Sequence, residues 1–376
     1  MNADPEGIRC ILMRGGSSKG AFFVTSDLPA DPQERDSLLL RIMGSPDSRQ
    51  IDGVGGAHPL TTKVAVVSPS DREDIDIEYL FLQVSVDRPE VSDQQNCGNM
   101  LAAVGPFALE RGLISATEGR TSVRILMKNT GALATASFPV EGGRPVYAGE
   151  TEISGVPGAA AEIRIEFQNI AGSSTGSLLP TGRVVDRVED IEVSLVDNGM
   201  PVVVLRASDV GVSGDESCEE LEANTDLTRT LERIRLTAGK LMNLGDVRGT
   251  TVPKLTMISP PRFGGAISTR TFIPHRCHQA IGVLGAVSVA TACLLPGSPA
   301  GTLAQLAPDA DVVRLEHPTG TFEAWVRLAV EAEETPRIEA AGIVRTARKL
   351  MDGLVFPRSY DANFRSLGRH SVPLNG

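Results

Sequence analysis

Apolar and polar positions along the first part of the chain follow two different periods. Four segments carry apolar runs or alternating apolar positions rich in β-branched side chains, which is typical of β-strands: 8–16, 21–29, 63–70 and 77–86. Residues 31–44 instead space their apolar side chains as a helix does and end in Gly44, a common helix stop.

Two further segments predict apolar helices. Residues 96–112 fit the helical period, and Pro106 within them should bend the helix or cost it one hydrogen bond. Residues 279–295 predict a second such helix, whose uncharged run of 16 positions from Ala280 to Leu295 is shorter than the roughly 20 residues that span a bilayer. We therefore expect it to be a buried central helix.

Each predicted central helix lies between groups of strands, so the two halves repeat one layout without a clear residue-level repeat. The remaining expected strands are 122–130, 132–140, 162–168, a hairpin over 191–208, 254–261, 312–320, 321–330 and 338–348. A charged helix is expected over 216–242. The segment 172–183, rich in Gly, Ser, Thr and Pro, is interpreted as a linker. The prediction is an α+β protein of two similar domains, 1–183 and 184–376, whose terminal strands are free to cross over.

Composition narrows the class of partner. The chain has 376 residues, 41% hydrophobic and 22% charged, which suffices for two packed cores. A net charge of -11 argues against nucleic acid and against an anionic membrane as partners, but a small anion needs only a local cluster of cations. Five scattered cysteines and no apparent signal peptide predict free thiols and a cytoplasmic location.

Lys63 and Cys97 are the leading candidates for chemistry. Lys63 stands between a Thr- and Gly-rich turn and an apolar run, where partial burial would favour the neutral amine. Cys97 stands in Asn-Cys-Gly-Asn at the expected head of a helix, where unpaired N–H groups stabilise a thiolate or an anionic ligand. A buried structural cysteine and a solvated lysine are the alternatives.

Cations gather in two other turns. Arg14 and Lys19 flank a Gly-Gly-Ser-Ser turn that lacks the spacing of a phosphate loop but suits a carboxylate. His275, Cys277 and His278 form a tight His-x-Cys-His cluster without an obvious fourth ligand, so we expect carboxylate binding there and no metal.

Four segments together carry a resemblance to a known family: RCILMRGGSSKGAFF, DGVGGAHPLTTKVAVV, VSDQQNCGNMLAAVGPFALERGLI and HQAIGVLGAVSVATACLLPG. They closely resemble the PrpF family of the diaminopimelate-epimerase-like superfamily. The resemblance implies two similar domains, each a mixed sheet wrapped around a central helix, with the active site in the cleft between them. It implies no cofactor and no metal, and it leaves a homodimer open.

The resemblance also implies roles for individual residues. Lys63 and Cys97 are the implied catalytic pair. The implied substrate-binding residues are Arg14, Ser17, Ser18, Lys19, Thr62, Asn96, Gly98, Asn99, Met100, Arg270, His275 and His278. Racemases of the superfamily use a cysteine at the head of each central helix. Here the second head, around Ala280 and Ile281, has none, and Cys277 lies a turn earlier, which disfavours a two-thiol racemase.

Three functions are compatible with these residues. The first, implied by the resemblance, is cofactor-independent 1,3-allylic proton transfer on 4-oxalomesaconate, an unsaturated tricarboxylic keto acid of aromatic-compound degradation. The second is isomerisation of a related polycarboxylate such as 2-methylaconitate. The third is carboxylate binding without chemistry, which would not require a lysine and cysteine pair.

Overall fold

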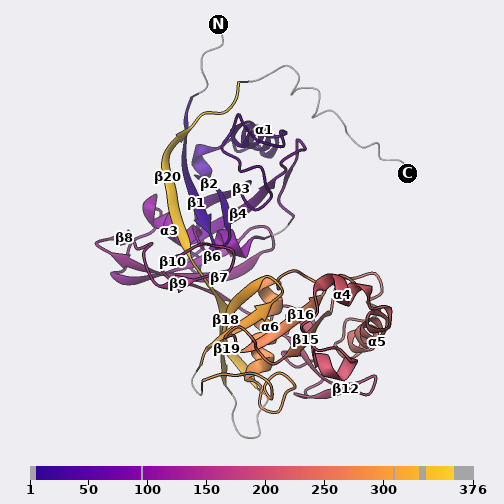
Figure 1. The fold of residues 1–376 in the computed structure, drawn as a ribbon. Helices are drawn as coiled ribbons and strands as arrows, with labels where there is room; N and C mark the ends of the chain where they lie inside the picture. The colour runs from indigo at the N-terminus through magenta and orange to yellow at the C-terminus, as the bar shows by residue number, and fades with distance from the viewer. Residues whose placement is uncertain (1–5, 95, 308–309, 330–335, 360–376) are drawn as a thin grey trace. The chain divides into compact units, whose positions relative to one another are not determined.

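The computed structural model describes residues 6–94, 96–307, 310–329 and 336–359 (Figure 1). It divides into two compact units, Met1–Thr151 with Gly158–Ile163 and Arg345–Gly376, and Glu152–Pro157 with Arg164–Val344. The domain boundary expected at residue 183 differs from this division, because residues 164–183 belong to the second unit. The expected crossover is present, since the last strand returns to the first unit.

The first unit contains a mixed sheet. Its strands run in the order β20, β1, β2, β3, β4, β6, β7, with parallel pairing only at β2–β3 and β4–β6. Their bounds are β1 Ile8–Gly15, β2 Ser18–Val24, β3 Lys63–Pro69, β4 Ile77–Val84, β6 Gly119–Met127, β7 Ala132–Glu141 and β20 Ala347–Val355. Short elements of this unit are η1 Thr25–Asp27, β5 Val91–Ser92, β8 Arg144–Pro145 and β10 Ala159–Ala160. Strand β9 (Thr151–Glu152) spans the division between the units, and β11 (Ile163–Phe167) belongs mostly to the second.

The sheet of the first unit is covered on both faces. Helix α1 (Pro32–Met43) packs on one face against Phe23, Val64 and Leu82. The alternate positions of the same strands face the other way, where Phe22 contacts Phe107 with ring centroids 5.5 Å apart. A sheet buried on both faces explains the nearly continuous apolar run in β3.

The first central helix is broken. It consists of α2 (Gly98–Leu101) and α3 (Val104–Glu110) rather than the single helix expected over 96–112. The break falls at Ala102 and Ala103, because Pro106 has no N–H and its ring would clash with the carbonyl four residues earlier. The predicted effect of Pro106 is therefore confirmed.

The second unit repeats the pairing scheme of the first. From β13 to β18 its pairs alternate antiparallel, parallel, antiparallel, parallel, antiparallel, as β1 to β7 do in the first unit. The bounds are β12 Asp186–Val188, β13 Ile191–Asp197, β14 Pro201–Arg206, β15 Lys254–Ser259, β16 Ile267–Phe272, β17 Val312–His317, β18 Gly320–Ala329 and β19 Arg337–Arg345.

Helices occupy matching places in the second scheme. After β14 come η2 (Ala207–Val210), α4 (Cys218–Ala223) and α5 (Thr225–Leu241), and between β16 and β17 comes α6 (Val283–Leu294). The single helix expected over 216–242 is split because Asn224 caps the start of α5. Helix α6 begins at Val283, four residues later than expected, and most of it is fully buried. The predicted α+β fold with two similar domains is confirmed.

Candidate functional site

Lys63 lies at the start of β3 with only 7% of its side chain surface exposed. Its Nζ donates a hydrogen bond to Gln83 Oε1 at 2.7 Å and lies 5.0 Å from the centroid of the Phe81 ring. Among the described residues, no carboxylate forms an ion pair with it. The buried amine thus has a neutral amide, and no carboxylate, as its hydrogen-bond acceptor.

The orientation of the Gln83 amide is determined by its other contacts. Its Nε2 donates to the main-chain carbonyls of Pro59, Thr62 and Val84 at 3.1–3.2 Å. Carbonyl oxygens accept only, so the NH₂ group must face them and the amide oxygen must face Lys63. Gln83 therefore positions the amine and offers it an acceptor without a charge.

One face of β4 connects Lys63 with Cys97. Tyr79, Phe81 and Gln83 occupy alternate positions of β4 and so share a face, on which Gln83 is paired directly with Lys63. At the other end of this row, the Tyr79 hydroxyl donates to the main-chain carbonyl of Cys97 at 3.4 Å. Burial and the nearby Cys97 thiol raise the pKa of Tyr79 well above its usual value, so this hydroxyl stays protonated.

Cys97 is the N-cap residue of α2 and is half-buried, whereas the other four cysteines are buried. Its carbonyl also accepts the Leu101 N–H, which starts the helix. Burial raises the pKa of Cys10 and of Cys293 to about 12 each. Cys97 is thus the thiol with the best access to solvent or to a ligand.

The expected carboxylate turn is the β1–β2 hairpin. Gly16 adopts φ +51° there, and a Cβ on it would lie 2.2 Å from Asn99 Oδ1, so the turn requires glycine. The hydroxyl of Ser18 is buried and has no hydrogen-bond partner among the described residues, which is the mark of a group that a ligand or a water satisfies.

Arg14 is partly committed to this hairpin. Its Nη1 donates to Gly16 O at 2.9 Å and to the carbonyl and hydroxyl of Thr346 at 3.1 and 2.9 Å. Burial and the neighbouring Arg348 lower the pKa of Arg14. Lys19, paired with Arg14 across the hairpin, is half-buried, and its main-chain N–H donates to Leu60 O.

Several other expected binding residues have internal contacts. Asn99 donates to Ser17 Oγ at 3.2 Å and accepts from Arg345 Nε at 3.1 Å, which ties α2 to the hairpin. Thr62 donates to the buried Gln50 amide at 2.7 Å. The side chain of Met100 is fully buried.

Two expected residues beside Cys97 differ from these. Gly98 is the first residue of α2 and leaves its main-chain N–H uncovered by a side chain. Asn96 donates to Thr130 Oγ1 at 2.6 Å, while its Oδ1 is buried without a partner among the described residues.

The second unit separates the expected cations into two groups. His275 is 61% exposed and lies 3.8 Å from Glu232, and Arg276 pairs with Glu222 at 2.8 Å.

His278 is half-buried, and its Nδ1 accepts the Ala280 N–H at 2.8 Å. Arg270 is half-buried and donates to the carbonyls of Glu216 and Thr269. The structure thus places His278 and Arg270, but not His275, away from carboxylates.

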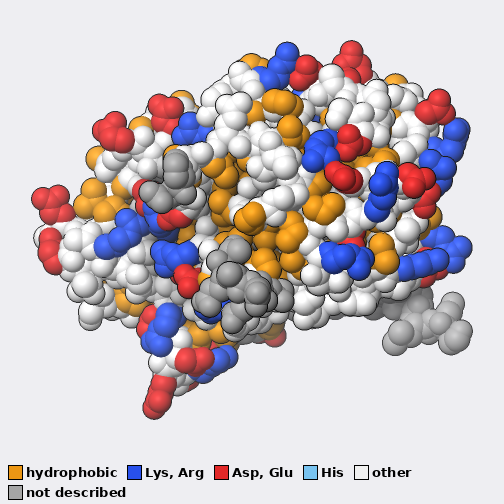
Figure 2. Space-filling view, turned by 90° about the horizontal axis from the view of Figure 1, so that it is seen from below, with side chains coloured by type: hydrophobic (Ala, Val, Ile, Leu, Met, Phe, Trp, Pro, Cys, Tyr) orange, Lys and Arg blue, Asp and Glu red, His pale blue; other side chains and the backbone are white. Residues whose placement is uncertain are grey.

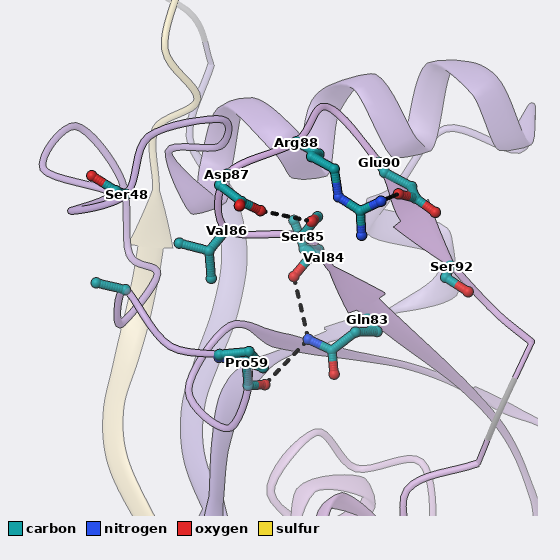
Figure 3. A pocket seen from close by; sticks show the side chains of 11 residues that line it. Ser48, Pro59, Gln83, Val84, Ser85, Val86, Asp87, Arg88, Glu90 and Ser92 are labelled. Atoms are coloured by element: carbon teal, nitrogen blue, oxygen red, sulfur yellow. Dashed lines mark hydrogen bonds and ion pairs between the residues drawn. The ribbon is translucent and has the colours of Figure 1, made fainter.

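A cavity of about 470 Å³ lies beside Gln83 in the first unit (Figure 3). Its walls come from the Ala57–Pro59 loop and from residues 83–92, and they include the ion pair of Arg88 with Glu90. The amide nitrogen of Gln83 points to Pro59 and Val84 in this view. Gln83 thus lines the cavity and also bonds Lys63, so a changed side chain at position 83 has free space beside it.

Charges on the surface are mixed in sign. On the face drawn in Figure 2, Lys and Arg side chains are interspersed with Asp and Glu. Within the described ranges, no helix is long and apolar enough to cross a membrane. The same part of the chain holds no group of three or more His, Cys, Asp or Glu side chains arranged to bind a metal ion.

Sequence reasoning missed Gln83, Phe81 and Tyr79. The alternation of β4 held the signal, because Gln83 is a polar residue at a position that continues the inward-facing row of Tyr79 and Phe81. The pairing of Lys63 with Gln83 depends on the strand register, which periodicity alone does not give.

Comparison with known proteins supports an assignment. The PrpF protein family matches residues 6–358. The chain is 55% identical to a (4E)-oxalomesaconate Delta-isomerase of Novosphingobium sp. over 92% of its length and 96% of that protein. It is also 55% identical to a 4-oxalomesaconate tautomerase of Pseudomonas putida over 93% and 95% of the two chains. The crystal structure of a methylitaconate-delta-isomerase, 34% identical, superposes with a TM-score of 0.82 over 94% of this chain and 96% of that one.

These relatives are isomerases, and they match nearly the whole chain. The alternative of a carboxylate-binding protein without chemistry is therefore wrong. The chain belongs to the PrpF family and is an isomerase.

Proposed function

We propose that the protein isomerises 4-oxalomesaconate by a cofactor-independent 1,3-allylic proton transfer, a step in the degradation of aromatic compounds. Two relatives 55% identical to this chain carry this substrate in their names. The observation that carries the chemistry is the buried Lys63 amine, held at 2.7 Å by the neutral amide of Gln83. A homodimer and a cytoplasmic location stay predictions.

In the proposed reaction, the neutral Lys63 amine takes a proton from the carbon next to a carboxylate. The electrons of the broken C–H bond spread through the conjugated system onto the keto oxygen as a dienolate. A new C–H bond then forms at the far end of the allylic system with a proton from the Cys97 thiol, and a proton passes from Lys63 back to the thiolate. General acid–base steps of this kind contribute about 10²–10⁴-fold each.

The carboxylates and the dienolate need donors and cations. In the first unit, the unpartnered Ser18 hydroxyl, Lys19 and the free main-chain N–H groups at the start of α2 are the best supported. In the second unit, Arg270 and His278 are proposed to bind a further carboxylate.

Deuterium incorporation tests the proposal. The purified protein is incubated in D₂O with 4-oxalomesaconate, 2-methylaconitate or 3-methylitaconate, and the products are followed by proton NMR. We expect fast isomerisation with exchange at the allylic carbons of 4-oxalomesaconate and much slower turnover of the other two. Faster turnover of 2-methylaconitate, the named substrate of a relative 35% identical, would move the assignment to that substrate.

A further inference from the structure

The two units carry a lysine at the same place in their folds. In the first unit, Lys63 is the first residue of β3, which pairs in parallel with β2 and antiparallel with β4. In the second unit, Lys254 is the first residue of β15, which pairs in parallel with β14 and antiparallel with β16. The sequences of the two halves do not align Lys63 with Lys254. The equivalence follows from the strand pairing, which is the same around β3 and β15.

The two lysines also lie on corresponding faces of their two sheets, each opposite the face covered by the helices α1 or α4 and α5. Val64 and Val66 pack toward α1, so Lys63 lies on the opposite side of its sheet, toward the central helix. Leu255 and Met257 pack into the core formed with α4 and α5. Lys254 therefore belongs to the opposite row of β15, with Thr256.

Lys254 differs from Lys63 in having no partner. No described residue accepts a hydrogen bond from its amine or forms an ion pair with it. It is half-buried, and burial, with a smaller contribution from the charge of Arg235, lowers its pKa. A half-buried amine without a counter-charge is unusual, because the desolvated charge is normally compensated.

His278 and His317 lie in segments linked to β15 and β16, where the carboxylates of Glu222 and Glu219 bond Cys277 and Gln279, the two neighbours of His278. His278 donates its main-chain N–H to Thr271 on β16, whose hydroxyl bonds that of Thr256 on β15. Thr319 links the His317 turn to the same loop, because its hydroxyl donates to Gln279 O at 2.7 Å.

The pKa values of His278 and His317 are lowered in part by the neighbouring positive charges. Burial lowers the pKa of His278, and the charge of Lys254 lowers it further. Burial likewise lowers the pKa of His317, with added effects from His278 and Arg270. The nearby His275 and Arg276, in contrast, are each beside a glutamate. Like charges whose own side chains form no ion pair are relieved when an anion binds among them.

We propose that Lys254, with His278 and His317, forms a carboxylate-binding site on the second unit, the counterpart of the Lys63 site on the first. The inference rests on the proposed function for the identity of the ligand, a polycarboxylate. It adds Lys254 and His317 to the binding residues. The chemistry is kept to the first unit, since the N-cap of α6 is Gly282 where the N-cap of α2 is Cys97.

Binding of tricarballylate tests the site, because this saturated tricarboxylate has no double bond to isomerise. Isothermal titration calorimetry at pH 7 is carried out on the full-length protein and on Lys254→Met, Lys254→Arg and Lys240→Met. Lys240 is the control, an exposed lysine at the end of α5. A lost hydrogen bond to a charged group corresponds to a Kd about 10- to 150-fold higher. We expect that loss for Lys254→Met, a smaller one for Lys254→Arg, and no change for Lys240→Met.

A second measurement, the NMR titration of His278, reports on the site without turnover and independently of calorimetry. Removal of the Lys254 charge should raise the NMR titration midpoint of His278, and saturating tricarballylate should raise it in the wild type. An unchanged tricarballylate Kd and an unchanged His278 midpoint in folded Lys254→Met would overturn the inference. If 4-oxalomesaconate is not a substrate but tricarballylate binding still depends on Lys254, the proposed function fails and the carboxylate site stands.

Discussion

The substitution Gln83→Glu tests whether the neutral hydrogen-bond partner of Lys63 matters for activity, because it leaves Lys63 in place and changes only the charge of that partner. The change places a carboxylate where an amide oxygen now accepts from Lys63 Nζ at 2.7 Å. A carboxylate in this place would stabilise the protonated amine and so remove the proposed base at neutral pH. The cavity beside Gln83 leaves the new side chain room to rotate.

The size of the effect follows from the distance and the burial. Two unit charges about 4 Å apart attract by about 4 kcal/mol at an effective dielectric constant of about 20. At about 1.36 kcal/mol per pH unit this corresponds to about 3 units, and desolvation of the new carboxylate reduces it. We expect the rising limb of the kcat profile to move up by about 1–3 pH units. At pH 7, kcat should then be about 10- to 1000-fold lower and should recover as the pH rises.

The assay is a profile of kcat from pH 6 to 10 for the wild type, Gln83→Glu, Gln83→Met and Asn129→Asp. Asn129 is a matched control, because its amide also bonds the main chain of β4, at Phe81, with no bond to Lys63. Gln83→Met should lower kcat without moving the midpoint. Loss of the Nε2 bonds should cost about 1–3 kcal/mol of unfolding free energy, a Tm decrease of roughly 2–12 °C.

A Gln83→Glu profile that superimposes on the wild type would show that the amine at Lys63 does not act as the base or does not face residue 83 in the working enzyme. A midpoint that moves equally in Asn129→Asp would assign the shift to general loosening of β4.

Four further outcomes follow from the same contacts. Lys63→Met should stay folded and lose at least about 10²-fold in kcat, measured with 4-oxalomesaconate, whereas exposed Lys128→Met should keep full activity. Iodoacetamide should label Cys97 first, as tryptic mass spectrometry can show, and Cys97→Ser should reduce kcat far more than Cys293→Ser. Arg14→Ala should lower Tm as well as raise KM, because three hydrogen bonds disappear. Lowered histidine pKa values mean that the unfolded chain binds more protons below about pH 6.5, so Tm should fall as pH decreases below that value, and less steeply in a His317→Gln variant.

Periodicity alone predicted most of the secondary structure. The strands around Val64 and Leu80 and the helix ending at Gly44 are where the pattern put them. The disturbance of the first central helix at Pro106 was predicted from the proline itself, not from the apolar spacing. The error lies in the charged segment, where Asn224 caps a new helix that the pattern ran through. Apolar periodicity cannot reveal such a break, because the buried face of the helix continues with the same spacing on both sides of it.

The chemistry of the candidate site was less accessible to sequence reasoning. The motif contexts singled out Lys63 and Cys97, whose roles stay predictions. The contacts of the cations were not predictable, because Arg14 bonds Thr346, 332 positions away, and His275 lies beside Glu232 on another element. A cation in a turn has the same appearance in the sequence whether it is free for a ligand or already paired.

Internal duplication explains why an allylic proton shift, rather than a two-thiol racemisation, suits this chain. The helix heads differ: α2 has Cys97 as its N-cap, while α6 has Gly282, and Cys277 lies before it. Cys277 is 6% exposed, and burial together with the neighbouring Cys218 thiol raises its pKa, so it is a poor proton carrier. The first unit thus contains an accessible thiol and an amine with a neutral partner, whereas the described thiols of the second unit are buried. This difference fits the proposed allylic proton shift, which needs one acid–base pair, and not a racemisation by two thiols, which needs a cysteine at both helix heads.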